Sequence, residues 1–526
     1  MELQLGIDGL VLGVSVLLLG AVLTAALASV PGSRLRIPGA LLFLGIGMIV
    51  GDDGFALIEL DDAALVRDLG VIALLLILFE GGLTTKPTDL RIAAVPGMAL
   101  ATLGVLVTAG LTGLGVWLVL GVDPLTAALL GSVVASTDAA AVFSMMRTTP
   151  LPRKVSAVLR IESGANDPIA VMLTVGILAS LEGMAVGPSD WAVFAATQLL
   201  GGVIVGGAVG LAGTWVLRRL ELGVEGLYPI LALAVAGVGY GTAAAIGASG
   251  FVAVYLVGLI IGALVPRHRR SVLGFHEAMA NAAEIGLFLL LGLLVFPSRL
   301  PAIALPALGV ALILILVARP AAVALCTLGS RMPWREQAVV SWAGLRGAVP
   351  IVLATFPFTA GIADGALIFD VVLFVVLVSV LVQGTTLLPL IRTLGVQVDR
   401  PAWSPVAEAL PLDGLDVDLV EIMVVDGLAI AGREIKDLPP PARALVAAVV
   451  RDDRVIIPRG DTVLCPGDVL LLTVQRERDA VARLTAWARG EERPHATEDD
   501  ALPVDQASVP PDRASLGPDG VDEPDR

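Results

Sequence analysis

The chain has 526 residues, of which 56% are hydrophobic and 16% charged, whereas soluble domains average about 25% charged residues. This composition excludes an ordinary soluble globular protein, and the abundant glycine, 58 residues, is typical of packed transmembrane helices. Two distant cysteines and three scattered histidines argue against a disulfide framework and a histidine metal centre, and most of the net charge of −15 belongs to the C-terminal region, which argues against nucleic-acid binding.

The apolar windows that are long enough to span or re-enter a bilayer number 13. They cover residues 10–29, 38–51, 68–84, 94–119, 124–147, 165–182, 191–218, 227–246, 250–265, 276–296, 302–328, 336–358 and 367–392. The first lacks the basic start and cleavage site of a signal peptide, so we expect it to be a true span. The sequence therefore predicts an all-α polytopic membrane protein with 13 transmembrane helices in a domain of residues 1–392.

Basic residues fall mainly in alternate loops. Fifteen lie in the odd-numbered loops between spans, and two, Arg67 and Arg299, lie in the even-numbered loops. Positive residues collect on the cytoplasmic side of a membrane. The pattern therefore predicts a multi-pass protein of the cell inner (plasma) membrane, with the N-terminus outside and the C-terminus in the cytoplasm.

The composition of the chain changes after Arg392. Residues 393–412, with Pro401 and Pro405, are typical of a linker. Residues 413–488 predict a small α+β cytosolic domain, because β-like runs at 419–425, 444–450, 454–457 and 469–474 precede a helical run at 477–488. Residues 489–526 are rich in Pro, Asp, Glu and Ser, which predicts a disordered acidic tail.

Polar residues interrupt the fifth window. Ser136, Thr137 and Asp138 stand in its middle, and such side chains compete with the helix for backbone hydrogen bonds. Non-helical backbone at membrane depth is tolerated only where it lines a cavity or is buried in protein. We therefore expect a broken helix here, either around a ligand site or as a satisfied polar kink.

Asp167 is the most informative residue, and it follows Glu162, Ser163 and Asn166 at the start of the sixth window. A carboxylate in hydrocarbon costs about 3 kcal/mol even on lenient scales, so an ionisable group there is by default a functional-site hypothesis. Ser163 lies four residues before Asp167 on the same helical face, and the two offer the hard oxygen ligands that suit an alkali cation. Asn166 is placed to hold the neighbouring broken helix by hydrogen bonds.

A second interruption lies in the twelfth window. Arg346 is the lone basic residue of the segment Trp342–Pro350, whose Gly and Pro residues again indicate an interrupted helix. We expect Arg346 to form a structural ion pair with Glu162. Two discontinuous helices at equivalent places in two halves of a chain point to a transporter site at the bilayer midplane.

Other charged residues lie within the predicted spans. Glu80 is an accessory ligand, a gate, or a group that reaches towards the interface. Arg319, before Pro320, either caps a break or neutralises an acid. Asp370 lies near the outer end of the last window, where hydration explains it, and Glu284 has no assigned role.

Three motifs together resemble the cation:proton antiporter family of the sodium/proton exchanger type. They are Ser-Thr-Asp at 136–138, Glu-Ser-Gly-Ala-Asn-Asp at 162–167 and Gly-Leu-Arg-Gly-Ala-Val-Pro at 344–350, and the resemblance covers residues 10–392. Residues 413–487 look like the C-terminal lobe of the regulator-of-potassium-conductance domain (TrkA-C). This pairing is similar to the bacterial potassium/proton antiporter subgroup.

The resemblance implies an architecture and a set of roles. It implies two inverted repeats, two broken crossing helices, a homodimer, and a core of spans 4–6 and 11–13 that moves as an elevator. Asp167 would carry the ion, Ser163 and Thr137 would help to ligate it, and Asp138 and Asn166 would neutralise or tie together the broken helices.

The remaining implied roles concern charge. Glu162 and Arg346 would form the structural ion pair, and Glu80 matches an acidic position near the site. Asn166 directly before the carrier Asp167 implies electroneutral exchange of one proton per monovalent cation.

Burial of Asp167 disfavours its charged form, so a proton and a cation should compete to neutralise it. Potassium is favoured through the regulatory lobe, whereas oxygen ligands alone do not distinguish it from sodium.

The alternative is a ligand-gated cation channel, although the sequence holds no Thr-Val-Gly-Tyr-Gly-like filter, and a receptor that only signals is a third hypothesis. No nucleophile, metal or cofactor constellation supports an enzyme, and a nucleotide or cyclic dinucleotide is the candidate ligand of the lobe.

Overall fold

The computed structural model describes residues 39–56, 58, 62–85, 87–138, 142–143, 151–183, 187–265, 268–396, 406–411, 417–425, 427–441, 444–451, 454–475 and 480–490. The chain folds as two compact units that divide between residues 401 and 402, and each unit has hydrophobic clusters of its own. The predicted first span, 10–29, and the predicted acidic tail beyond residue 490 lie outside the described residues.

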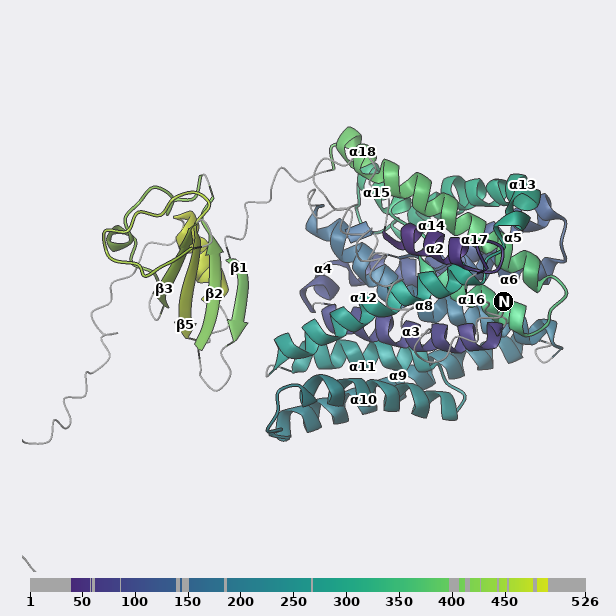
Figure 1. The fold of residues 1–526 in the computed structure, drawn as a ribbon, viewed down its shortest axis with the longest axis horizontal. Helices are drawn as coiled ribbons and strands as arrows, with labels where there is room; N and C mark the ends of the chain where they lie inside the picture. Colours follow the sequence, from purple (N-terminus) through teal and green to yellow (C-terminus); the bar gives the residue numbers. More distant parts are fainter. Residues whose placement is uncertain are drawn as a thin grey trace, which may run out of the picture. The chain divides into compact units, whose positions relative to one another are not determined.

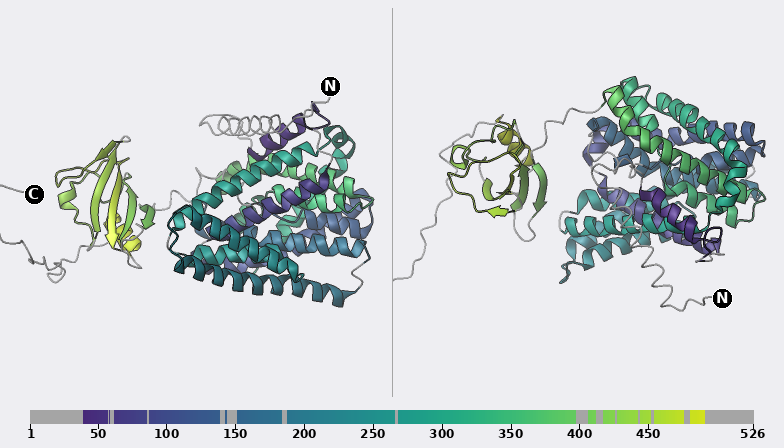
Figure 2. Two further views of the ribbon diagram at one scale, coloured as in Figure 1. Left: turned by 60° about the horizontal axis from the view of Figure 1, so that its bottom comes forward. Right: turned by 45° about the horizontal axis from the view of Figure 1, so that its top comes forward.

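The first unit is a bundle of helices (Figures 1 and 2). Helices α9, α10 and α11 pack side by side, and α6 packs against α8. The described α-helices are α2 (Gly39–Val50), α3 (Ala63–Thr84), α4 (Pro87–Ala99), α5 (Val105–Leu120), α6 (Pro124–Val133), α8 (Arg153–Leu181), α9 (Pro188–Arg219), α10 (Leu227–Ala245), α11 (Gly250–Leu264), α12 (Arg269–Leu293), α13 (Leu300–Ile313), α14 (Arg319–Cys326), α15 (Trp334–Trp342), α16 (Ala348–Thr359), α17 (Gly365–Val378) and α18 (Gly384–Leu394).

Capping residues set several helix ends. Asp62 precedes α3, Asp123 precedes α6, and Ser249 precedes α11, and each side chain accepts a hydrogen bond from a backbone N–H of the first turn. Gly121 ends α5 in the left-handed conformation, with φ of 66°. These ends therefore follow from local sequence, and the apolar stretches between them supply the packing surface.

Several helices of the first unit are long enough to cross a membrane. Among the described residues, six helices are long and apolar enough to cross a membrane, namely Asp89–Leu120, Arg153–Leu181, Ser189–Arg219, Leu227–Ala245, Pro297–Cys326 and Gly365–Leu394. Shorter apolar helices, Leu41–Val50, Pro124–Val133, Gly250–Leu264 and Ala348–Thr359, coincide with the short and interrupted windows. The protein is therefore a multi-pass membrane protein, and the total of 13 spans remains a prediction.

The sixth helix begins earlier than the sequence predicted. Helix α8 starts at Arg153 rather than at residue 165, and Pro168 lies inside it. Its first turns carry Arg153, Lys154 and Arg160, which lowered the local hydropathy and hid them from an apolar window. The polar segment 162–167 therefore lies in the middle of a continuous helix and not at a helix start.

Two helices are interrupted where the sequence predicted. Residues 136–138, after α6, are non-helical, and so are residues 344–347, between α15 and α16. Three other long helices contain short π-helical segments, η1 (Leu100–Gly104), η3 (Leu314–Ala318) and η4 (Ser379–Gln383). Such segments are rare and often mark functional sites. Segment η3 ends directly before Arg319, and η4 carries Ser379 and Gln383.

The second unit is an antiparallel sheet with a C-terminal helix (Figure 1). Its core holds Val420, Leu470 and Leu472 from the strands and Leu484 and Trp487 from helix α19 (Ala480–Arg489). The described strands are β1 (Val406–Pro411), β2 (Val417–Met423), β3 (Ala444–Arg451), β4 (Arg454–Ile456) and β5 (Val469–Gln475), in the order β1-β2-β5-β3-β4.

The sheet begins earlier than the sequence predicted. Strand β1 lies within residues 393–412, which were expected to be a linker, and it pairs with β2 from Val406 opposite Ile422 to Pro411 opposite Asp418. The β1 sequence has a single β-branched residue and ends in proline, which a central strand does not tolerate but an edge strand does. The other predicted strands coincide with β2 to β5 within two residues.

An ion pair between the buried Asp468 and the partly exposed Arg451 closes the turn before β5. Asp468 is 1% exposed, and Arg451 Nε and Nη2 donate to its two carboxylate oxygens, both at 2.7 Å. The backbone N–H of Cys465 donates to Asp468 Oδ2 at 2.7 Å. These bonds, the one from Arg451 foremost, hold the pKa of Asp468 below its usual value.

Loss of the Asp468 charge should destabilise this unit. Asp468→Asn keeps the shape but removes the charge that pairs with the partly exposed Arg451, which still donates to the Val463 carbonyl, at a cost of about 1–2 kcal/mol. We expect faster amide hydrogen exchange in β2 and β5 of the full-length protein in detergent. Because the folded-state pKa lies below the unfolded value of about 3.9, the stabilisation is complete above about pH 4 and is lost as pH falls through the folded-state pKa.

Glu434→Gln provides the control for this variant. It removes the ion pair between Glu434 and Lys436, whose side chains are 36% and 59% exposed, and should leave stability nearly unchanged because water screens the pair. Equal exchange protection in Asp468→Asn and wild type would contradict the assigned role of the Asp468–Arg451 pair.

Candidate functional site

The two interrupted helices cross at their breaks. The backbone N–H of Asp138, after α6, donates to the carbonyl of Leu345, between α15 and α16, at 2.8 Å. A helix end leaves backbone groups without intrahelical partners, and here groups from two ends satisfy each other. The two breaks therefore form one hydrogen-bonded unit rather than two separate kinks.

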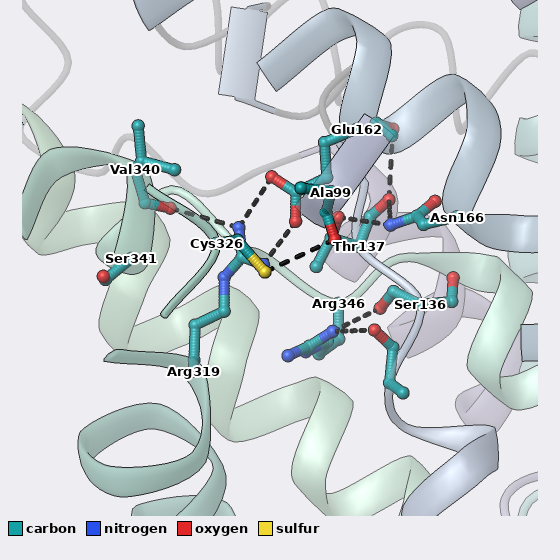
Figure 3. Close-up of polar contacts among 12 residues, drawn as sticks. Ala99, Ser136, Thr137, Glu162, Asn166, Arg319, Cys326, Val340, Ser341 and Arg346 are labelled. Atoms are coloured by element: carbon teal, nitrogen blue, oxygen red, sulfur yellow. Dashed lines mark hydrogen bonds and ion pairs between the residues drawn. The ribbon is translucent and has the colours of Figure 1, made fainter. Parts of the chain in front are cut away.

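Arg346 secures the end of α6. Its Nη1 donates to the carbonyls of Ala135 and Ser136 at 2.7 and 2.6 Å (Figure 3). The Arg346 side chain is 1% exposed, and a cation at the freed carbonyls of a helix C-terminus complements the helix dipole. The predicted ion pair between Arg346 and Glu162 was wrong, because the carbonyls of the first break take the guanidinium.

Glu162 pairs with Arg319 instead. Both side chains are almost wholly buried, and the Arg319 guanidinium donates to both carboxylate oxygens of Glu162 (Figure 3). Arg319 Nη2 also donates to the carbonyl of Val340, at 3.3 Å. Arg319 therefore links α14 to α8 and α15, which is the acid-neutralising role that the sequence left open for it.

Asp167 faces the first break. Its side chain is buried, 6% exposed, and the hydroxyl of Ser136 donates to Asp167 Oδ1 at 2.6 Å. Among the described residues, no Lys or Arg forms an ion pair with Asp167. A buried charge is costly unless it is paired, so this carboxylate favours a proton or a bound cation.

Two polar side chains of α8 hold Thr137. Asn166 Nδ2 donates to Thr137 Oγ1 at 2.6 Å, and the Ser163 hydroxyl donates to the Thr137 carbonyl at 3.1 Å. Asn166 thus contacts the broken helix as the sequence predicted. Asn166 Oδ1 is fully buried and finds no hydrogen-bond partner among the described residues, which makes this oxygen available to a ligand.

Two glycines of the second break make room for charged side chains. A Cβ at Gly347 would lie 2.2 Å from Asp138 Oδ2, and a Cβ at Gly344 would lie 2.4 Å from Arg319 Nε. Asp138 therefore approaches the N-terminus of α16, where free N–H groups favour a negative charge. The close approach of both side chains explains why this segment needs glycine at these two positions.

The π segment η4 supports the second break. The hydroxyl of Ser379 accepts the backbone N–H of Arg346 at 3.1 Å and donates to Gln383 Oε1 at 2.6 Å. Gln383 Nε2 donates to the carbonyl of Trp342, the last residue of α15, at 3.0 Å. Both ends of the break are thereby held to one helix.

Glu80 and Glu284 lie on α3 and α12, which pack against each other. The charge of Glu284 interacts with those of Asp138 and Glu80, and Glu80 also interacts with Glu277. Glu284 is therefore near enough to Asp138 and to Glu80 for their charges to interact. Glu284, which had no role assigned from the sequence, therefore belongs to the surroundings of the site.

Some residues of the site were not singled out from the sequence. Ser136 stood within the Ser-Thr-Asp motif but received no role, and nothing in its spacing to Asp167 reveals the contact. Ser379 and Gln383, four residues apart, are polar residues in a mostly apolar window, and that interruption is a signal that could have found them.

The site is rich in oxygen, and at the two breaks Asp167 is the acid that, among the described residues, has neither a basic partner nor a helix N-terminus beside it. Arg319 balances Glu162, Arg346 satisfies backbone carbonyls, and Asp138 lies at a helix N-terminus. Carboxylate, hydroxyl and carbonyl oxygens are the ligands of hard cations. The arrangement around Asp167 can therefore accept either a proton or a small hard cation.

Comparisons with known families agree with this chemistry. A family model described as "Sodium/hydrogen exchanger, transmembrane" matches residues 18–393, and one described as "TrkA-C domain" matches residues 419–486. The sodium proton antiporter MjNhaP1 from Methanocaldococcus jannaschii, solved at pH 8, has a similar structure, with a TM-score of 0.64 at 23% identity. The similarity covers 73% of this chain and 99% of MjNhaP1, and it shows a shared fold.

Curated relatives cover both units of the chain. The chain is 39% identical over 494 residues to the K(+)/H(+) antiporter NhaP2 of Shewanella oneidensis, which covers 90% of this chain and 84% of that protein. It is 37% identical over 475 residues to the K(+)/H(+) antiporter NhaP of Alkalimonas amylolytica, which covers 88% and 81%. The names of these relatives describe antiporters and favour neither a channel nor an enzyme.

A double-mutant cycle should separate the two basic partners considered for Glu162. Glu162→Gln and Arg319→Gln should each cost about 3–5 kcal/mol, because each leaves a buried charge unpaired. The combined variant should be less destabilised than the sum of the two, whereas Glu162→Gln and Arg346→Gln should add. Thermal unfolding in detergent measures all of these variants.

The pair of Arg160 and Asp89, at 3.5 Å, supplies the control, because the Arg160 side chain is 42% exposed although Asp89 is buried. Arg160→Gln should cost less than either single variant of the Glu162–Arg319 pair. Strong coupling between Glu162 and Arg346, with none to Arg319, would refute the pairing seen in the structure.

Gly347→Ala should lower the melting temperature. The added Cβ forces Asp138 away from α16 and should cost about 1–3 kcal/mol. Gly286→Ala is the matched control, because nothing lies within 4 Å of a Cβ at Gly286, in α12, and alanine favours a helix by up to about 1 kcal/mol. Similar melting temperatures for the two variants would show that Asp138 does not need the close approach to Gly347.

Proposed function

Since the chain belongs to the sodium/hydrogen exchanger family, we propose that it is a secondary active antiporter that exchanges a monovalent cation for a proton across the cell inner membrane. One observation carries the proposal. Asp167 is buried against the crossing of two broken helices and, among the described residues, has no basic partner. A transport site needs such a group, because a buried carboxylate that no basic side chain neutralises favours the binding of a cation or a proton from solution.

The proposed cycle follows from electrostatics. Asp167 is neutralised either by a proton or by a cation, so the two ions compete for one position. Only the neutralised site crosses the apolar barrier at a low free-energy cost. Exchange results when the site crosses in one direction with a cation and returns with a proton.

The hydrogen bonds around the breaks support an elevator-type movement. They connect α6, α8, α15, α16 and η4 through Leu345, Arg346 and Thr137. We propose that these elements move as one body in each protomer of a homodimer. Glu80 and Glu284 are proposed to attract cations towards Asp167 from the α3–α12 side.

Potassium is the proposed cation. The relatives at 37–39% identity are named K(+)/H(+) antiporters, whereas a relative named Na(+)/H(+) antiporter NhaP, from Pseudomonas aeruginosa, is 30% identical over 383 residues.

Asn166 adds no second charge beside Asp167, so we propose electroneutral exchange of one proton per cation. The TrkA-C unit is proposed to regulate exchange by binding a nucleotide-type ligand in the cytoplasm.

Proton flux in sealed proteoliposomes tests the proposal. In wild type a gradient of K⁺, and to a smaller extent of Na⁺ or Li⁺, should drive protons across the membrane in the opposite direction to the cation. If exchange is electroneutral, clamping the membrane potential should leave the rate unchanged within about twofold. Asp167→Asn should reduce exchange at least about 100-fold, because the amide cannot be charged and then neutralised by either ion.

Asp370→Asn is the matched control, since Asp370 is also a buried acid, 9% exposed in α17, and interacts with Arg299 rather than with the breaks. It should exchange at near wild-type rates. Saturable exchange that survives in Asp167→Asn would reject Asp167 as the carrier, and ion flux far above carrier rates without proton coupling would reject antiport.

A further inference from the structure

The hydroxyl that touches the carrier carboxylate belongs to Ser136. Ser136 Oγ lies 2.6 Å from Asp167 Oδ1, and Ser136 is 1% exposed. The neighbouring hydroxyl, Thr137 Oγ1, instead accepts the amide N–H of Asn166 at 2.6 Å. The resemblance to the antiporter family pointed to Thr137, yet the geometry pairs the carboxylate with the residue before it.

Ser136 is held firmly by its backbone. Its carbonyl accepts from Arg346 Nη1 at 2.6 Å, and the next carbonyl, that of Thr137, accepts from Ser163. A hydroxyl carries one donor and two acceptor positions, and its hydrogen rotates to suit its surroundings. Ser136 Oγ can therefore donate to an empty carboxylate and later, once its hydrogen turns away, offer a lone pair to a cation.

We propose that Ser136 Oγ, rather than Thr137 Oγ1, is a hydroxyl ligand of the transported alkali cation, which binds beside Ser136 Oγ and Asp167 Oδ1 and contacts both. The inference rests on the proposed function. These two oxygens lie 2.6 Å apart while the hydroxyl donates to the carboxylate, and both can contact one hard cation once that hydrogen turns away. Asn166 Oδ1, the buried oxygen that has no partner among the described residues, is a further acceptor in the same cluster.

Thr137 has a different task. The N–H of Asn166 occupies one lone pair of Thr137 Oγ1 and presents the positive end of its dipole there, which disfavours a cation at that oxygen. Thr137 and Asn166 together fix the break against α8. Removal of the Thr137 hydroxyl should therefore lower stability and leave the affinity for the cation nearly unchanged.

Ser132, in the adjoining helix α6, provides a matched control. It lies four residues before Ser136 and is fully buried, its hydroxyl donates to the Leu129 carbonyl at 2.7 Å, and it lies 3.2 Å from the Thr174 hydroxyl. Ser132→Ala removes an equally buried hydroxyl without touching Asp167. Any general effect of a lost hydroxyl in α6 should appear in this variant.

The test measures the apparent KM for K⁺ and for Na⁺, with kcat, in proteoliposomes at one fixed alkaline pH. Ser136→Ala should raise the KM about tenfold, the loss expected for one ligand to a charged group, with kcat within about threefold of wild type. Ser136→Thr keeps the hydroxyl and should restore the KM. Thr137→Val and Ser132→Ala should keep the KM within about twofold, and Thr137→Val should melt at a lower temperature.

Cation-dependent thermal stabilisation of the detergent-purified protein gives a second readout that needs no transport. K⁺ or Na⁺ should stabilise wild type, Thr137→Val and Ser132→Ala, and should do so for Ser136→Ala only at about tenfold higher concentration. If Ser136→Ala does not reach the membrane, Ser136→Cys, which keeps the volume and offers a poor ligand for hard cations, should show the same rise.

The outcomes separate the two proposals. A wild-type KM and wild-type stabilisation in Ser136→Ala, or a tenfold rise in Thr137→Val instead, overturns Ser136 as the ligand and leaves antiport intact. If wild type exchanges neither K⁺ nor Na⁺ for protons, the proposed function fails, and the stabilisation by cations still decides whether Ser136 binds one.

Discussion

The buried charge of Asp167 governs the rest of the structure. At the two breaks, within the described residues, the other charged groups have stabilising contacts: Glu162 has Arg319, Arg346 has the carbonyls at the end of α6, and Asp138 approaches the start of α16. Asp167 has a single hydroxyl. Because a lone buried carboxylate is expensive, the protein is most stable when an ion from solution neutralises it. The site is built so that the missing partner must come from outside.

The crossing of the two breaks makes this possible. A continuous helix has no free carbonyl or N–H to offer, whereas a break inside the protein supplies both. Arg346 takes the carbonyls of the first break, its own N–H goes to Ser379 in η4, and the first break is tied to the second by Asp138 and Leu345. Backbone groups that would otherwise need water are thus satisfied within the bundle, and the carboxylate of Asp167 remains without a positive partner to neutralise it.

Much of this could be predicted from the sequence, and the family assignment, made from three short motifs, was confirmed by the family matches. Apolar windows located the helices, and clustered Ser, Thr, Asp and Gly located both breaks. The partner of Glu162 could not be predicted, because Arg319 lies 157 residues away and its π segment leaves no mark on hydropathy. The start of α8 and strand β1 were missed because charged residues and proline masked elements that tertiary contacts stabilise. Ser136 was missed because a contact between two helices has no sequence spacing.

The central claim is that a proton and an alkali cation displace each other at Asp167. The most direct measurement is proton release on addition of K⁺ or Na⁺ to purified protein in weakly buffered detergent near neutral pH. The account predicts acidification that saturates at no more than about one proton per chain and is absent in Asp167→Asn. Acidification of the same size in Asp167→Asn, or none in a wild-type protein that demonstrably binds the cation, would contradict it.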